Sequence, residues 1–533
     1  MPLLHAEETL DPEECVSGNH VNAPCPILAT SFCRKGGIPR ISTLQAFIFL
    51  AFLIALTACK VGPNYNRPGF EAPAAYKETG ASTAIVPPPN PAGGGWQKAN
   101  PSDGMLRGKW WEIYQDPQLN NLEEKISPNG KPNNQQLRQA METYLAAHDQ
   151  IKVARSALFP TLSAGPSATR NRVSTNQPLF NKADNPSYND FEITGQASWE
   201  PDFWGRVRRT VSAARDTAQA SAADMAIVDL SLHAEMASDY FQLRGLDSET
   251  KLLTATVADL ERQLDLTQRL FAGGIGTDVD VAQARTQLET VRAQLIDVGV
   301  ARAQYEHAIG TIANLKLNEF TIPLSPLDQS SPLPKVPAGV PSQLLERRPD
   351  IAAAERLTAA ANEQIGIAIS AYYPTVTLSG TAGFQSTNPG TLIQGPSALW
   401  SLGGQATELL FDAGQRHALT SQARHVYEAQ AAAYRNTIFQ AFNDVEDQLS
   451  SLRILEQEST VEDRAVASAQ HSFDLSNQRY KGGVTSYLEV LTSESTLIQN
   501  QRTAIDLRTR QFVSSVSLIR SLGGGWDTTQ LPK

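Results

Sequence analysis

The chain has 533 residues and a formal net charge of −10, and 19% of its residues are charged. This length and composition allow a folded core and give no electrostatic bias toward nucleic acid, so we expect no nucleic-acid partner. All four cysteines lie within the first 59 residues, and the last of them is Cys59. A disulfide framework and a cysteine-ligated metal site are therefore excluded from the rest of the chain.

The N-terminal part contains a short apolar run at residues 44–56, which basic residues precede between 34 and 40. Its 13 residues are fewer than the roughly 18 to 20 that a transmembrane helix needs. A basic segment, an apolar run and the small residues Thr57 and Ala58 stand in the order of a secretory signal peptide, so we predict that residues 1–58 are removed. A buried core helix is the alternative.

Residues 1–33 carry an acidic lead-in that does not fit a signal peptide. We therefore expect that this segment is a misassigned start. Translation would then begin downstream, near residues 34–44, at a codon other than that for methionine.

The remainder of the chain is internally duplicated. Proline is absent from 202–322 and from 397–531, so both stretches are candidates for very long helices. The string FAGGIGTDVDVAQARTQL at 271–288 aligns with YKGGVTSYLEVLTSESTL at 480–497. SALFPTLS at 156–163 likewise aligns with SAYYPTVT at 370–377. Two copies of one unit of about 200 residues are the simplest explanation.

Each copy is predicted to contain a helix, a β-hairpin and a long helical hairpin. The first copy spans 131–320, with the β-hairpin at about 160–202 and the helical hairpin at about 205–314. The second spans 346–522, with the β-hairpin at about 374–411 and the helical hairpin at about 413–522. The flanking segments are 59–130, a linker at 321–345 and a C-terminal tail at 523–533.

The predicted strands are amphipathic. At 375–384 apolar residues or glycines alternate with polar residues or glycines, and 161–169 shows the same alternation. Each segment has about the length of a tilted transmembrane strand, although hairpins of a water-soluble protein fit the pattern too. Four strands cannot close a barrel with a lumen, and an open edge is not tolerated in lipid. Several chains must therefore share one barrel if the strands span a membrane.

The long helices carry the heptad spacing of coiled-coil seams. Two series show it: Leu253, Val257, Leu260, Leu264, Val281, Leu288, Val291, Leu295 and Val298, and then Leu491, Ile498, Ile505, Phe512 and Ile519. The periodicity breaks at the pairs Gly273-Gly274 and Gly482-Gly483, where we expect helix-to-helix turns with positive φ.

Further strings carry a resemblance to a known family. They are ACKVGPNYNRP (58–68), WWEIYQDPQLNNL (110–122), LPKVPAGVPSQLLERRPDIAAAE (333–355) and LIRSLGGGW (518–526). With the paired turn motifs, they make the chain similar to TolC-type outer-membrane factors, in the branch of NodT-like efflux lipoproteins. The string LERRPDI at 345–351 is the most specific, and it predicts a helix start near Pro349.

The resemblance implies a fold class and an assembly. The fold is a mixed one, a transmembrane β-barrel continued by a long α-helical coiled-coil barrel. A homotrimer would share one 12-stranded barrel, with four strands from each chain, and an equatorial domain would surround it, built from residues near 59–130, 315–345 and the tail. The partners implied are a periplasmic adaptor, an inner-membrane pump of the RND type and the lipid of a Gram-negative outer membrane.

The resemblance also assigns site residues. Leu56-Thr57-Ala58-Cys59 resembles a lipobox, in which Cys59 becomes the lipidated N-terminus. The adaptor would dock at the turns through Gly273, Gly274, Thr277, Gly482, Gly483 and Ser486. A periplasmic gate would comprise Leu488, Glu489, Thr492, Asp278 and Asp280, although Thr492 replaces an acidic residue of the family pattern.

The implied function is passive export through the outer-membrane duct of a tripartite efflux system. Type I protein secretion and metal-ion efflux use the same duct, so the cargo stays open. The eight histidines lack metal spacing, and no nucleophile elbow or phosphate loop occurs, so we expect no enzyme and no cofactor besides the lipid. Arg206, Arg208 and Arg209 are interpreted as a solvated helix start. A lipid-anchored coiled-coil protein without a pore is the alternative from a different class.

Overall fold

The computed structural model describes residues 60–70, 72–73, 75–79, 108–176, 186–327, 333–334, 336, 341 and 344–532, which all belong to one compact unit, 56–533. The predicted signal peptide, the predicted translation start and Cys59 lie outside these residues.

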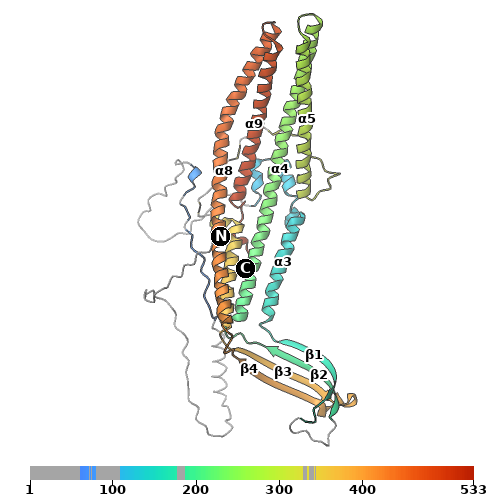
Figure 1. Ribbon diagram of the computed structural model, residues 1–533, viewed down its shortest axis with the longest axis vertical. Coiled ribbons are helices and arrows are strands. Elements are labelled where there is room, and N and C mark those ends of the chain that lie inside the picture. Colours follow the sequence, from blue (N-terminus) through green and yellow to red (C-terminus); the bar gives the residue numbers. More distant parts are fainter. Residues whose placement is uncertain are drawn as a thin grey trace, which may run out of the picture. The chain divides into compact units, whose positions relative to one another are not determined.

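The same succession of elements occurs twice along the chain (Figure 1). The first copy contains α3 (Gln135–Ser156), β1 (Thr161–Arg172), β2 (Ser187–Trp199), α4 (Arg206–Ala272) and α5 (Asp278–Ile312). The second contains α6 (Leu344–Arg347), α7 (Pro349–Ser370), β3 (Thr375–Ser386), β4 (Ala398–Thr407), α8 (Gln415–Lys481) and α9 (Tyr487–Ser521). Short elements are η1 (Lys77–Thr79), η3 (Trp110–Tyr114), α2 (Pro117–Glu123), η4 (Pro128–Gly130), η6 (Pro389–Thr391), η7 (Gly395–Ser397) and η8 (Thr528–Gln530).

The start of α7 follows from the string LERRPDI. Pro349 occupies the first turn, where its missing N–H costs nothing, and Arg348 is the N-cap residue. The Arg348 guanidinium lies 2.6 Å from Asp350 and 3.1 Å from Asp444 of α8, and it also donates to the Ser521 carbonyl of α9. One arginine therefore joins the start of α7 to both helices of the second hairpin.

The four strands form one antiparallel sheet in the order β1-β2-β3-β4, so the β2–β3 pair joins the two copies. The register places like residues in rows across the sheet. One row is Leu162, Ala197, Gly380 and Leu402, and the next is Ser163, Gln196, Thr381 and Ser401. Because neighbouring rows point to opposite faces, the sheet has one apolar and one polar face. The predicted alternation is confirmed, and β1 and β4 are the edges.

The helices pack through the predicted seams. Helix α4 contacts α3, α5, α7 and α9, and α8 packs against α9. Between α4 and α5 the buried residues are Leu253, Leu260, Leu288, Val291 and Val298. On α9, Ile498, Ile505, Phe512 and Ile519 are buried, as the heptad spacing predicted. Within the described ranges, no helix combines the length and the apolar character needed to cross a membrane.

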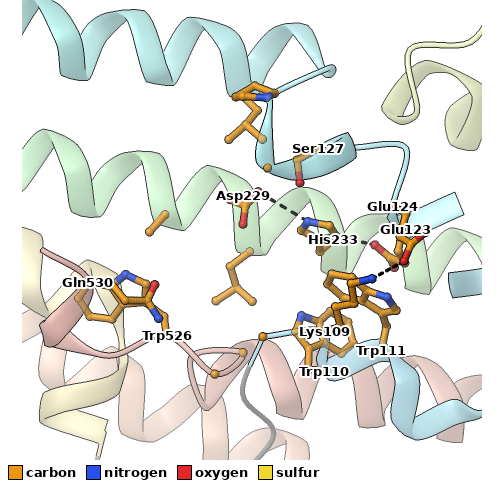
Figure 2. Close-up of a pocket in the computed structure, with 18 of the residues that line it drawn as sticks. Lys109, Trp110, Trp111, Glu123, Glu124, Ser127, Asp229, His233, Trp526 and Gln530 are labelled. Atoms are coloured by element: carbon orange, nitrogen blue, oxygen red, sulfur yellow. Dashed lines mark hydrogen bonds and ion pairs between the residues drawn. The ribbon is translucent and has the colours of Figure 1, made fainter. Parts of the chain in front are cut away.

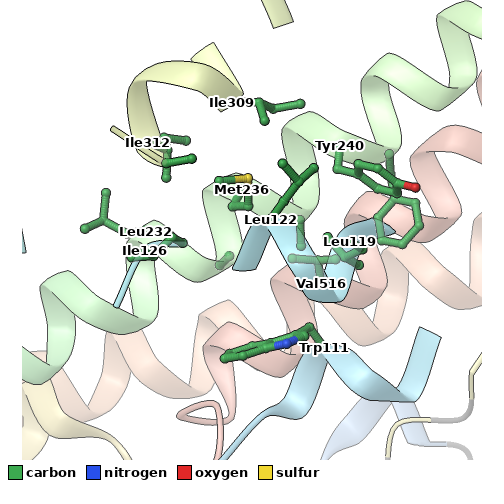
Figure 3. Close-up of a cluster of buried hydrophobic side chains, with 14 of the residues drawn as sticks. Trp111, Leu119, Leu122, Ile126, Leu232, Met236, Tyr240, Ile309, Ile312 and Val516 are labelled. Carbon is green, nitrogen blue, oxygen red and sulfur yellow. The ribbon is translucent and has the colours of Figure 1, made fainter. Parts of the chain in front are cut away.

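A larger core lies where α2 and η3 pack on the middle of α4 (Figure 3). Its members come from η3, α2 and the turn after it, α3, α4, α5 and α9, and include Trp111, Leu119, Leu122, Ile126, Leu232, Met236, Tyr240, Ile309, Ile312 and Val516. Asp116 caps α2 through the Gln118 amide and accepts a hydrogen bond of 2.5 Å from the Tyr240 hydroxyl. This core fixes the short N-terminal elements to the long helices.

One expectation about the basic cluster is wrong. Arg209 is fully buried rather than solvated, and its Nη1 lies 2.8 Å from Glu363 of α7. Its Nε donates to the Val61 carbonyl at 2.5 Å. A Cβ at Gly366 would lie only 2.2 Å from the same Nε, so glycine makes the room. Lys60 adds a second cation at 3.0 Å from Glu363, so the start of the described chain is held at the junction of α4 and α7.

A buried acid–base pair accompanies the core (Figure 2). Nδ1 of His233 lies 2.6 Å from Glu123, and Asp229 lies 3.6 Å from the other ring nitrogen. The ring stacks on Trp111 with centroids 4.4 Å apart. Burial alone would lower the pKa of His233, but hydrogen bonds to Asp229 and Glu123 outweigh it and raise the pKa from 6.5 to about 9. These hydrogen bonds favour the protonated imidazole, while burial also raises the pKa of Glu123 from 4.5 to about 7.

We predict that this pair makes stability depend on pH. The raised pKa of His233 adds stability that is complete below pH 6.5 and is lost as the pH rises through about 9. Melting temperatures of the purified protein should therefore fall over this interval, with a loss of about 1–3 kcal/mol. His233→Gln should shift the fall toward neutral pH, because the buried Glu123 carboxyl then titrates without its cationic partner, whereas His148→Gln, at an exposed position of α3, should leave the profile unchanged. Equal pH profiles for wild type and His233→Gln would contradict the assignment.

Candidate functional site

The first candidate site is the pair of helix-to-helix turns. Helix α4 has 67 residues and runs from the end of β2 to its turn, which therefore lies about 100 Å from the sheet. Helix α8 has the same length and leads to the second turn. Both turns consequently lie at the ends of the helical hairpins remote from the sheet (Figure 1).

The backbone of the turns corrects the expectation for their glycines. Gly273 and Gly482 have φ of −81° and −82° and simply end their helices. Gly274 and Gly483 have φ of +75° and +71° and alone in each pair adopt the left-handed conformation. The Gly274 amide donates to the Phe271 carbonyl at 2.9 Å, the arrangement of a helix C-cap. A side chain would thus be strained at the second glycine but not at the first.

The two turns differ in how the next helix is capped. Thr277 forms a capping box with Asp280, in which each side chain accepts a hydrogen bond from the other residue's amide. Ser486 stands at the same place before α9 and makes no side-chain cap. Asp280 is therefore engaged in the turn, and Asp278 is exposed beside it.

The residues predicted for the gate occupy the first two turns of α9. Leu488, Glu489 and Thr492 are exposed, whereas Tyr487 and Val490 point into the helical packing. The Glu489 carboxylate accepts a hydrogen bond from Thr485 and lies 3.4 Å from the Arg479 guanidinium. The structure thus brings the α9 residues together on one surface, and Asp278 and Asp280 lie on the other hairpin.

Behind this surface lies a polar group that the sequence interpretation missed. Glu494 is 4% exposed, and it accepts a hydrogen bond from Gln263 of α4 at 2.9 Å. The signal was a carboxyl within the seam, three residues after Leu491 and four before Ile498. A heptad seam normally carries apolar residues at such a position.

A cavity of about 820 Å³ lies beside His233, and it too was not predicted (Figure 2). Its walls come from η3, η4, α4 and the C-terminal tail, including Trp110, Trp111 and Trp526. The charged groups of its lining pair with one another, Lys109 with Glu124 and His233 with Glu123. Among the described residues, no group of three potential metal ligands occurs. The cavity is therefore a consequence of how the C-terminal tail packs on α4, and its lining gives no indication of a bound ligand.

Comparisons with known proteins agree with this architecture. A family model described as outer membrane efflux protein matches residues 130–314 and 340–524, one match in each copy. The probable efflux pump outer membrane protein TtgC of Pseudomonas putida KT2440 is 30% identical over 494 residues, covering 91% of this chain and 96% of that protein. The pyoverdine export outer membrane protein OpmQ of Pseudomonas aeruginosa PAO1 is 30% identical over 436 residues, covering 81% and 90%.

Solved structures give the same result. The outer-membrane channel OprN superposes with a TM-score of 0.77 at 27% identity, and the match covers 88% of this chain and 100% of that one. Family model, relatives and structure coincide over both copies of the duplication. The chain therefore belongs to the outer membrane efflux protein family, and it functions as an outer-membrane efflux channel.

Proposed function

We propose that this efflux channel is a homotrimer whose three four-stranded sheets close into one barrel of 12 strands. The observation that carries the proposal is a sheet with an apolar face and two edges, β1 and β4, that pair with no other strand in the described part of the chain. Lipid offers no hydrogen bonds to an edge strand, so each edge needs a partner. Head-to-tail pairing of β4 with β1 of the next copy satisfies both edges and closes as a ring.

Exposed apolar side chains next to both edges support this pairing. Phe159 precedes β1 and is 63% exposed, and Leu410 and Phe411 follow β4 and are 89% and 83% exposed. The helix that continues from β4 also exposes apolar residues along its length, namely Leu419, Val426, Phe439, Ile454, Val461 and Leu475. Such surfaces on a soluble monomer would be costly, and a neighbouring copy would cover them.

The polar face of the sheet would line the duct, and the helical hairpins would continue it as an α-helical barrel into the periplasm. The channel itself would be passive and export small molecules supplied by a pump of the RND type through a periplasmic adaptor. The adaptor would dock at the two turns, through Gly273, Gly274, Thr277, Gly482, Gly483 and Ser486. Those positions are exposed or form the turn backbone, which leaves them accessible.

Leu488, Glu489 and Thr492 would form the gate, with Asp278 and Asp280 from the first copy. Three-fold symmetry would set three Glu489 carboxylates on one ring, which favours cations. Cys59 would carry a covalent lipid as an auxiliary anchor in the outer membrane of a Gram-negative bacterium. Lys60, next in the chain, is held at Glu363 close to where α4 leaves the sheet, and this supports a lipid position near the membrane.

We predict that cysteines at the two sheet edges will cross-link different copies. Thr161 begins β1 and Thr407 ends β4. Within one chain they are separated by three strand spacings of about 4.8 Å across the sheet and by a further offset along β4, which is too far for a disulfide. We expect covalent dimers and trimers on non-reducing gels after oxidation of the double variant Thr161→Cys/Thr407→Cys. A second double variant, Thr161→Cys/Gln405→Cys, covers a shifted register. The single variants are the controls. Only monomers from both double variants would refute the shared barrel.

We predict that Glu489→Ala weakens block by divalent cations, because it removes the carboxylate ring. Single-channel recording in planar bilayers should show the blocking concentration of Mg²⁺ rise by about tenfold. Glu458→Ala, at an exposed position of α8, is the matched control and should behave as wild type. Unchanged block would remove Glu489 from the gate, and absence of any conductance from the wild type would favour a coiled-coil protein without a pore.

We predict that Cys59→Ser abolishes acylation without abolishing conductance. The shared barrel would hold the protein in the bilayer on its own, so trimers that reach the membrane should still conduct. Intact mass spectrometry measures the acyl chain, and planar-bilayer recording measures the channel. An acylated Cys59→Ser protein would show that the lipid is attached elsewhere.

A further inference from the structure

The seam between the two helical hairpins contains a buried hydrogen-bonded chain close to the gate. Nε2 of Gln263 on α4 donates to Oε1 of Glu494 on α9 at 2.9 Å. The Tyr487 hydroxyl, at the start of α9, donates to Oε1 of Gln263 at 3.3 Å. Gln263 therefore connects two points of α9 with one point of α4, and it does so behind the exposed surface of Glu489.

This chain is incompletely satisfied. Oε2 of Glu494 and the hydroxyl of Tyr480 are both buried, and neither has a hydrogen-bond partner among the described residues. The ring centroids of Tyr480 and Tyr487 lie 5.4 Å apart, so the two buried atoms without a hydrogen-bond partner belong to the same region. A cavity of about 410 Å³ adjoins it and is lined by Gln263, Tyr480 and Tyr487. Water could enter there and satisfy the unpaired atoms if α9 moved away from α4.

The packing around Glu494 leaves its carboxyl without a counterion. The charged and titratable groups nearby are Asp259 and Arg262 of α4, Asp280 of α5, Tyr480 and Lys481 of α8 and Tyr487 of α9. Asp259 and Arg262 pair with each other, and Asp280 caps its own helix. A buried carboxylate with one hydrogen bond is costly, whereas the neutral acid is not. Burial accordingly raises the pKa of Glu494 from 4.5 to about 7, although the bond from Gln263 lowers it.

We propose that Gln263, Glu494 and Tyr487 form a proton-dependent link that holds the α8–α9 hairpin against α4 and thereby positions the gate residues of α9. Neutral Glu494 keeps the seam closed, and ionised Glu494 draws water into the adjoining cavity and loosens it. The connection to channel opening rests on the proposed gate. The link itself is a property of one chain and can be tested separately.

The direction of the pH effect follows from the raised pKa. The pKa of Glu494 is about 7 in the closed seam and 4.5 when the carboxyl is exposed to water. The resulting stabilisation of the closed seam is therefore complete below pH 4.5 and is lost as the pH rises through 7. Loosening should therefore increase from acidic to mildly alkaline pH. A shift of this size changes the opening equilibrium by about tenfold or more between pH 5 and 8.

Thiol labelling tests the link without any conductance measurement. Asn477 of α8 lines the adjoining cavity, and Asn477→Cys introduces a cysteine into a body that otherwise has none after Cys59. The labelling rate of this variant should rise about tenfold or more from pH 5 to pH 8. This rise is corrected for thiolate formation, which is measured on a Gln457→Cys variant at an exposed position of α8. Adding Glu494→Gln should remove the rise, because the amide mimics the neutral acid. Adding Glu458→Gln instead should leave it unchanged.

Channel recording then separates this link from the proposed function. Open probability should rise with pH in the wild type and not in Glu494→Gln. A pH-dependent labelling rate in a protein that never conducts would overturn the channel assembly and keep the link. A corrected labelling rate equal at pH 5 and pH 8, or unaltered by Glu494→Gln, would overturn the link whatever the conductance shows.

Discussion

The hydrogen-bonding requirement of a sheet edge is the constraint on which the rest of this structure depends. A four-stranded sheet with an apolar face is suited to lipid, yet within the described part of the chain no further strand pairs with the outer sides of β1 and β4. The pairing of the edges also determines where the helices lie, because α3 leads into β1 and α8 leads out of β4. In the proposed trimer, pairing of β4 with β1 of the next copy would also bring α8 beside α3 of that copy. In that assembly, one set of contacts would both close the barrel and assemble the helices.

Because the two copies share one architecture, the differences between their helical hairpins indicate where the two hairpins behave differently. Both copies keep a 67-residue helix followed by a 35-residue one, so the two hairpins match in length. They differ at the turns, where Thr277 is locked by Asp280 while Ser486 makes no side-chain cap. Glu494 and the exposed Glu489 belong to the second copy as well. The α8–α9 hairpin is therefore the one built with looser restraints near its tip.

Periodicity in the sequence was sufficient to predict the elements, because strands and coiled coils impose periods of two and seven on their faces. The alternation at 375–384 and the heptads ending at Ile519 both reappear in the packing. Burial of Arg209 escaped prediction, since it depends on Gly366 and Glu363 from a helix more than 150 residues away. Glu494 was visible as a carboxyl in an apolar seam, but its partner Gln263 lies in the other copy. Contacts between residues of different copies leave no pattern in the neighbouring sequence from which they could be predicted.

Buried polar groups recur along α4, and three of its contacts with the other long helices show a physical reason for this. Arg209 meets Glu363 near the sheet, Asp247 accepts from Arg302 of α5 beside the large core, and Gln263 meets Glu494 near the turn. An apolar heptad seam can slip by a whole repeat at little cost, whereas a buried charge or amide has one partner and penalises every other register. Long helices therefore need such groups at intervals. The first two are ion pairs, which fix the register through opposite charges. The third is a lone carboxyl, so the contact that it makes between the hairpins depends on a proton.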